Sequence, residues 1–133
     1  MKMMCSKRKN PTRASTTKAL GDQAESQSLH QLVEAGLTLL ARNYRSPGRG
    51  GGEIDLIMRE PDGTVVFVEV RSRQAVDFGG AGASVGRQKQ RRIIFTARHF
   101  LSRLLVWPPC RFDVMAQEAG EWTWLKGAFD AGR

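Results

Sequence analysis

The chain has 133 residues, a formal net charge of +8, and 41% hydrophobic and 26% charged residues, which are the size and composition of one globular domain. No apolar run approaches the roughly 18 residues that a membrane-spanning helix needs, so the composition excludes a membrane protein. The two cysteines, Cys5 and Cys110, form no paired motif, which excludes a disulfide scaffold and favours a reducing, cytoplasmic setting.

The charge is unevenly distributed along the chain. Residues 1–20 carry a net charge of +6, residues 21–70 carry −4, residues 71–111 carry +8 and residues 112–133 carry −2. An acidic segment followed by a basic one favours a polyanionic partner, such as a nucleic acid whose phosphates contact the lysines and arginines. The same pattern also fits bases spread over the solvated face of a helix, and charge alone does not separate the two interpretations.

Residues 1–18 are predicted to form a basic disordered tail, and residues 19–133 a single domain. The tail contains no apolar stretch of the about 7 to 15 residues that a secretory signal requires. Met1, Met3 and Met4 are all candidate starts. We therefore expect the tail to add positive charge to the domain, not a targeting signal.

A helix is predicted over residues 19–35, with Gly36 as its stop. Helical spacing places its inward face on Glu25, Leu29, Leu32 and Gly36, with Ala24, Ser28 and Val33 beside them. Glu25 would then lie close to the buried face, where an unpaired carboxylate is costly. It therefore needs a partner there, unless it lies at the edge and reaches water or caps a loop.

Three strands are predicted next, over residues 38–44, 53–59 and 65–73. The last two alternate between apolar and polar residues and are joined by Pro61-Asp62-Gly63, a strong turn signal, so we predict an antiparallel hairpin. The preceding loop, residues 46–52, is rich in glycine but lacks the lysine and hydroxyl residue of a phosphate-binding loop. Its glycines are interpreted as flexibility beside a cleft.

The hairpin is expected to bring two acids together. If its centre is Asp62, Asp55 lies directly opposite Glu69, and the Cβ atoms of such partners are about 4.5 to 5.5 Å apart. Alternation assigns both acids to one face, with Glu53, Ile57, Phe67, Arg71 and Arg73, and assigns to the other, core face Ile54, Leu56, Met58, Val66, Val68 and Val70. We therefore expect helices on both sides of the sheet and charges lining a cleft.

Adjacent carboxylates repel each other, and a bound cation, a neighbouring base or protonation of one acid relieves the repulsion. Two acids with a carbonyl oxygen and waters make a hard oxygen site that suits Mg²⁺ or Mn²⁺. The alternative is neutralisation by Arg71, Arg73 or Arg111 without a metal. Physical chemistry alone leaves both possibilities open.

A second helix is predicted over residues 86–104, and it is strongly basic. Its inward residues would be Ile93, Ala97, Phe100, Leu101 and Leu104, and the rest of its surface carries Arg87, Lys89, Arg91, Arg92, Arg98 and Arg103. Strands are predicted over residues 111–116 and 121–125. The last places Trp122 and Trp124 on one face, where packing against a helix is favoured over stacking on bases. The isolated His30 and His99 are assigned no chemistry.

Taken together, the motifs resemble a known group of proteins. GEIDLI at residues 52–57, Glu69 in an EVR motif and an acid on the preceding helix are similar to the PD-(D/E)XK nuclease superfamily. More narrowly, the chain from about residue 19 to its end resembles the YraN-like uncharacterised family, related in fold to archaeal Holliday-junction resolvases. The residues that carry this likeness are GDQAES (21–26), RNYR (42–45), VFVEVRSR (66–73), Lys89, RFDV (111–114) and GAF (127–129).

The resemblance implies an α/β, restriction-endonuclease-like core in which helices flank a central mixed sheet of about five strands. It also implies a divalent cation, Mg²⁺ or Mn²⁺, held by Asp55 and Glu69 with help from Glu25, and a nucleic-acid substrate, with DNA favoured over RNA. The basic residues expected to contact that substrate are Arg73, Arg87, Lys89, Arg92 and Arg111.

One position departs from the superfamily pattern, because Arg71 stands where a lysine is expected two residues after the second acid. Arginine stays protonated, so it can stabilise charge on a phosphate but is a poor proton acceptor. Lys89, from the following helix, is a candidate substitute for the lysine. A phosphate contact or a plain surface position is nevertheless the favoured interpretation of Lys89.

Three functions follow from these residues. The first is a metal-dependent phosphodiesterase that acts on structured DNA, with Asp55, Glu69, Arg71 and Lys89 as the catalytic group. The second is a nucleic-acid-binding module that keeps the nuclease fold without turnover. The third is an adaptor whose basic surface binds acidic proteins. The sequence decides neither the structure of the substrate nor whether the protein is a monomer or a homodimer.

Overall fold

The structure is a computed structural model that describes residues 17–73 and 85–131. Its elements, in chain order, are α1 (Thr17–Glu34), β1 (Thr38–Arg45), β2 (Glu53–Arg59), β3 (Val65–Arg73), α2 (Arg87–Leu101), β4 (Cys110–Glu118) and β5 (Glu121–Phe129). Of the predicted tail, residues 1–16 lie outside the described residues. Helix α1 begins at Thr17, two positions before the predicted start at Ala19.

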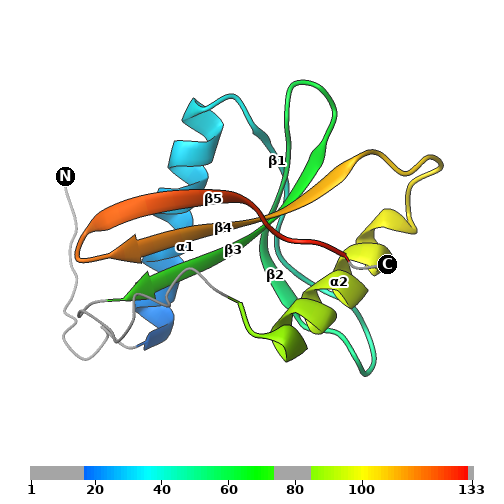
Figure 1. Ribbon diagram of the computed structural model, residues 1–133, viewed down its shortest axis with the longest axis horizontal. Coiled ribbons are helices and arrows are strands. Elements are labelled where there is room, and N and C mark those ends of the chain that lie inside the picture. Colours follow the sequence, from blue (N-terminus) through cyan, green and yellow to red (C-terminus); the bar gives the residue numbers. More distant parts are fainter. Residues whose placement is uncertain (1–16, 74–84, 132–133) are drawn as a thin grey trace, which may run out of the picture.

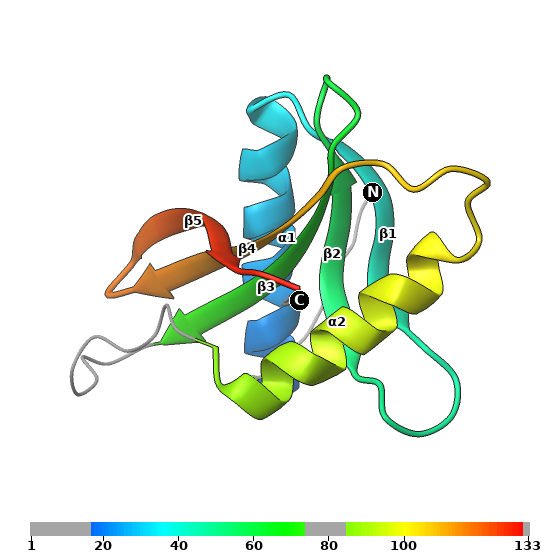
Figure 2. The ribbon, with the colours of Figure 1, turned by 45° about the vertical axis from the view of Figure 1, so that its right-hand side comes forward.

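The strands form one mixed sheet in the order β1-β2-β3-β4-β5. Neighbouring strands are antiparallel except for β3 and β4, which are parallel. A parallel pair needs a crossover connection, and helix α2 lies within that connection. Helices α1 and α2 cover opposite faces of the sheet (Figure 1, Figure 2). The predicted α/β fold, with helices flanking a five-stranded mixed sheet, is confirmed, and the arrangement is consistent with a restriction-endonuclease-like core.

Each face of the sheet has its own apolar core. On the α1 side, Leu32 packs against Leu56, Met58, Val66 and Val68. On the α2 side, the core is formed by Ile57, Phe67, Phe112, Val114 and the inward face of α2. Trp122 and Trp124 pack against the α1-side core, as the sequence favoured, and Trp124 also donates its indole N–H to Asp113. The prediction that the sheet is covered on both sides is confirmed.

One residue of the hairpin was assigned to the wrong face. Ile54 packs in the α2-side core and not with Leu56 on the α1 side. The regular alternation fails beside Asn43, whose φ of 52° lies in the left-handed region. Its neighbours therefore face opposite helices: Arg42 bonds Ser26 on α1, whereas Tyr44, the register partner of Ile54, bonds His99 on α2.

Two apolar residues expected in or beside the inward face of a helix are exposed. The predicted helix extended to residue 104, which would have placed Leu104 on its inward face. Helix α2 instead ends at Leu101, and Leu104 is 38% exposed. Val33 is 49% exposed because the inward face of α1 follows Ala24, Ser28 and Leu32. Both errors come from extending a helical pattern without knowing where the neighbouring strands lie.

Candidate functional site

The β2–β3 hairpin confirms the predicted turn and register. Gly63, at a φ of 97°, completes the turn, and the N–H of Thr64 bonds the Asp62 carboxylate at 2.9 Å. Paired residues include Leu56 with Val68, so continuing the register places Asp55 beside Glu69. The backbone pairing of β2 and β3 itself ends at Leu56 and Val68.

Asp55 lies immediately beyond the last backbone pair between β2 and β3, Leu56 with Val68. Its Oδ2 accepts a hydrogen bond of 2.8 Å from the backbone N–H of Val70, so a side chain replaces the strand partner. Burial and, next in size, the neighbouring Glu69 carboxylate raise the pKa of Asp55, the bond from Val70 acts in the opposite direction, and together these effects place the pKa at about 8. The site therefore disfavours a second free negative charge and favours a proton or a cation.

Glu25 reaches the same place from helix α1, since it is a further cause of the raised pKa of Asp55. It has the partners that the sequence required: Asn43 Nδ2 donates to Glu25 Oε1 at 3.0 Å, and Arg42 Nε lies 3.7 Å from the same oxygen. Asn43, which donates this hydrogen bond, has a left-handed backbone conformation. Sequence reasoning missed the role of Asn43, although it belongs to the RNYR motif.

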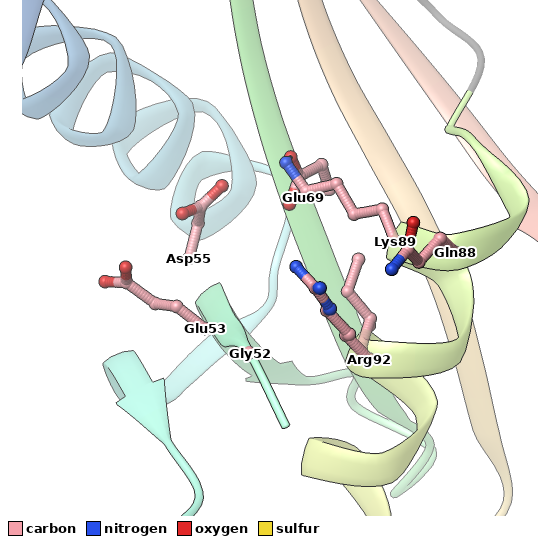
Figure 3. A pocket seen from close by; sticks show the side chains of 8 residues that line it. Gly52, Glu53, Asp55, Glu69, Gln88, Lys89 and Arg92 are labelled. Atoms are coloured by element: carbon pink, nitrogen blue, oxygen red, sulfur yellow. The ribbon is translucent and has the colours of Figure 1, made fainter. Parts of the chain in front are cut away.

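Lys89 completes the acidic pair from the opposite side. Its ammonium group forms an ion pair with Glu69 Oε2, and the two side chains point toward each other in Figure 3. Glu69 is buried, at 6% exposure, whereas the side chain of Lys89 is half exposed. The structure thus brings Lys89 to the carboxylates. The sequence alone favours a phosphate contact or a plain surface position for this residue.

A cavity of about 430 Å³ opens beside these groups (Figure 3). It lies between the start of β2, strand β3 and the first half of α2. Its lining combines three acids, Glu53, Asp55 and Glu69, with two bases, Lys89 and Arg92. The remaining lining residues are Gly52, Gln88 and Ile93. The site can therefore hold an anionic ligand near bases while presenting carboxylate oxygens to a cation.

The glycine-rich loop is fastened to α2 by Thr96. This residue is completely buried, and its hydroxyl bonds Gly52 N at 2.8 Å, Gly52 O at 3.2 Å and Ser46 Oγ at 3.1 Å. A methyl group on Gly51 would come within 1.9 Å of Ser46 Oγ and 3.0 Å of Thr96 Oγ1. The interpretation of these glycines as flexibility is wrong for Gly51 and Gly52, which permit close approach to the helix.

The other predicted bases lie in different settings. Arg71 is half-buried on β3 and is not among the residues that line the cavity. Arg87 is exposed at the first position of α2, and Arg92 lines the cavity. The side chain of Arg73 lies outside the described part of the structure.

Arg111 belongs to a separate buried network. Its guanidinium bonds both oxygens of Asp113 at 2.8 and 2.9 Å, and it also pairs with Glu60 at 2.7 Å. The hydrogen bond to Asp113 is the main cause that raises the pKa of Arg111. Asp113 is completely buried and also accepts from Trp124 Nε1 and Gly127 N. This network gives the RFDV and GAF motifs a structural role and engages the guanidinium that was expected to contact nucleic acid.

The acids fit a hard divalent cation by donor type. Within residues 17–73 and 85–131, no three His, Cys, Asp or Glu side chains form a ready-made metal cluster. Mg²⁺, however, is usually bound through one or two carboxylates together with substrate phosphates and waters, not in an all-protein cage. Asp55 and Glu69 supply two such carboxylates in one cavity, at a position where burial and mutual repulsion favour a cation.

None of the helices in the described part of the chain is long and apolar enough to cross a membrane.

Comparison with known proteins identifies close relatives. The model of the Uncharacterised protein family UPF0102 matches residues 24–116. A UPF0102 protein of Albidiferax ferrireducens is 62% identical over 120 residues, which cover 90% of this chain and 94% of the relative. UPF0102 proteins of an Acidovorax species and of Paracidovorax citrulli are each 60% identical, over 89% and 90% of this chain and 89% of each relative. The YraN-like resemblance is confirmed: the chain belongs to the uncharacterised protein family UPF0102.

Proposed function

We propose that the protein is a metal-dependent phosphodiesterase that cleaves structured DNA. The observation that carries this proposal is the meeting of Asp55, Glu69 and Lys89 at one cavity, from β2, β3 and α2. Acids on adjacent strands with a nearby lysine are also what the PD-(D/E)XK resemblance implies. A DNA substrate would place this activity in the cytoplasm.

Asp55 and Glu69 would hold the cation, with Glu25 oriented beside them by Asn43. A divalent cation bound there supplies a water of lowered pKa and a Lewis acid for a phosphoryl oxygen. The residues of the chain then have two tasks: the carboxylates accept hydrogen bonds from water, and the bases hold the phosphate. The raised pKa of Asp55 indicates that this centre favours added positive charge.

Lys89 is better placed than Arg71 to act at the phosphate. Its ammonium group already contacts Glu69 within the cavity, and its half-exposed side chain can turn toward a ligand. A lysine can also lower its pKa and exchange a proton, which an arginine does not. Arg92, on the next turn of α2, adds a fixed positive charge to the same wall. Arg71 keeps the charge-stabilising role that its position on β3 implies.

A second function is a nucleic-acid-binding module without turnover. The observation that favours it is helix α2, which carries Arg87, Lys89, Arg91, Arg92 and Arg98 and no acidic residue. Such a helix can bind phosphates whether or not the acids are catalytic. In this case Lys89 serves as the permanent counter-ion of Glu69.

The deciding experiment incubates the purified protein with branched, duplex and single-stranded DNA in Mn²⁺. The variants are Asp55→Asn, Glu69→Gln and Lys89→Ala, with Lys126→Ala as a control, because Lys126 lies over Trp124 on β5. Cleavage by the wild type and the control that is lost in both acid variants supports the nuclease. Salt-sensitive binding without cleavage supports the module. The absence of both removes nucleic acid as the partner.

A further inference from the structure

Four consecutive apolar residues project from the fold after helix α2. Leu104 is 38%, Leu105 103%, Val106 79% and Trp107 55% exposed, and we call residues 104–107 the apolar finger. In Figure 2 this loop extends away from the sheet beyond the end of α2. Contiguous exposed apolar residues mark interaction sites, whereas scattered ones need no explanation.

The apolar finger is held at both ends. At its start, Leu104 N donates to Leu101 O at 2.9 Å, which ties it to the last turn of α2. At its far end, Pro109 O accepts from Val65 N at 2.9 Å, which ties the loop to the sheet. Trp107 is followed by two prolines, which further restrict the backbone. The backbone of the loop is therefore restrained at both ends, which lowers the entropic cost of binding.

The charge along helix α2, which leads to the apolar finger, indicates the chemistry of the partner. Arg91 and Arg98 are exposed on the outer surface of α2, which has no acid of its own. Among the described residues, no acid pairs with either arginine. Arg103, next to the apolar finger, lies with its guanidinium over the rings of Tyr44 and Phe100. An apolar tip at one end of a helix that exposes arginines along its outer surface complements a nucleic acid, which offers both phosphates and the faces of bases.

The length of helix α2 separates the apolar finger from the candidate active site. Lys89 and Arg92 lie in the first half of α2 at the cavity, and the apolar finger follows the other end of this helix. Helix α2 has 15 residues, and a rise of about 1.5 Å per residue gives it a length of about 22 Å. This length equals roughly six or seven base steps of a duplex at 3.4 Å each. Nucleic acid lying along α2 would thus reach both sites at once.

We propose that the apolar finger stacks on bases at a break in the nucleic-acid duplex, roughly six or seven steps from the phosphate held at the cavity. Stacking needs an uncovered base face, which a continuous duplex does not offer but a junction, gap or single-stranded end does. This inference rests on the proposed function and names its substrate class. The apolar finger selects interrupted duplexes, while α2 supplies affinity for any duplex.

The test compares a gapped duplex with a continuous duplex of the same length, in EDTA so that no cleavage occurs. The variants are the triple Leu105→Ala/Val106→Ala/Trp107→Ala and the double Arg91→Ala/Arg98→Ala. Val33→Ala, an exposed apolar residue on α1, is the control. We expect the triple variant to lose roughly 5- to 150-fold in affinity for the gapped duplex, the range for base stacking, and to bind the continuous duplex as the wild type does. The arginine variant should weaken both equally.

Each other outcome overturns the inference. If the triple variant binds both duplexes like the wild type, the apolar finger has no role in binding, although the proposed function stands. If the wild type binds neither duplex, the proposed function fails and the inference fails with it. Wild-type binding to phosphatidylglycerol vesicles that the triple variant loses, with unchanged DNA affinity, assigns the apolar finger to a membrane surface. A wild-type dimer that the triple variant converts to a monomer in sedimentation assigns it to a second copy of the chain.

Discussion

Replacing Asp55 with asparagine tests the electrostatics of the candidate site. The substitution keeps the size of the side chain, and its amide oxygen can still accept the hydrogen bond from Val70. It removes only the group that titrates. In EDTA, Asp55→Asn should therefore be more stable than the wild type at neutral pH.

The size of this gain follows from the pKa of Asp55, which is raised from 3.8 to about 8. The unfolded carboxyl loses its proton near pH 4, whereas the folded one keeps it until about pH 8. Between these values the folded state holds more proton at Asp55, so the contribution of this carboxyl to wild-type stability should fall by about 1.4 kcal/mol for each pH unit. The gap between variant and wild type should approach about 4 kcal/mol at pH 7 as an upper limit, and vanish near pH 4.

Urea denaturation at intervals from pH 4 to pH 8 measures this gap. The control is Asp62→Asn, in the exposed turn, where the bonds from Thr64 lower the pKa of the carboxyl. Its effect should not change between pH 5 and pH 8, because Asp62 is ionised throughout in both states. With Mn²⁺ present the gap should narrow as the Mn²⁺ concentration rises, and reverse once this exceeds about 1,000 times Kd, since a cation that binds only the folded wild type stabilises it by mass action. A stability gap that does not depend on pH, or a variant less stable than the wild type at pH 8, would refute the raised pKa of Asp55. It would favour an ionised Asp55 held in a salt bridge.

Three further substitutions probe the surroundings of the site. Gly51→Ala should lower the free energy of unfolding by about 1–3 kcal/mol, because the new methyl group meets Ser46 Oγ, and adding Ser46→Gly should recover most of the loss in urea denaturation. Asn43→Gly keeps the left-handed backbone but removes the donor to Glu25, so thermal shifts should show weaker Mn²⁺ stabilisation than in the wild type, whereas an unchanged shift would separate Glu25 from the cation. Asp113→Asn should cost about 1–3 kcal/mol in urea denaturation, because the completely buried side chain then turns an N–H group toward the donors that Asp113 accepted from, and a loss below about 1 kcal/mol would contradict the network.

The hairpin and its acids could be predicted because their signals are local. A Pro-Asp-Gly turn between two alternating strands determines the register, and the register alone places Asp55 near Glu69. The two-sided burial of the sheet followed from apolar residues on both faces, such as Leu56 and Phe67. These inferences need no knowledge of how distant elements pack.

The features that were missed depend on packing between elements distant in sequence. The contact of Lys89 with Glu69 depends on where α2 crosses the sheet, which periodicity does not reveal. The change of face at Ile54 follows from a left-handed residue on the neighbouring strand, for which asparagine is only a weak signal. The engagement of Arg111 could have been suspected from Asp113, an acid between the apolar Phe112 and Val114.

The contacts of the Thr96 hydroxyl have a consequence for how a ligand enters the cavity. This one oxygen joins the loop before β2 to helix α2, so the wall that carries Asp55 and the wall that carries Lys89 are coupled to each other. Spreading them apart would break buried hydrogen bonds, at a cost of about 1–3 kcal/mol for each group left unsatisfied. The two walls of the cavity are therefore held together before any ligand binds. A phosphate would bind between preformed walls, without a closing movement of the loop.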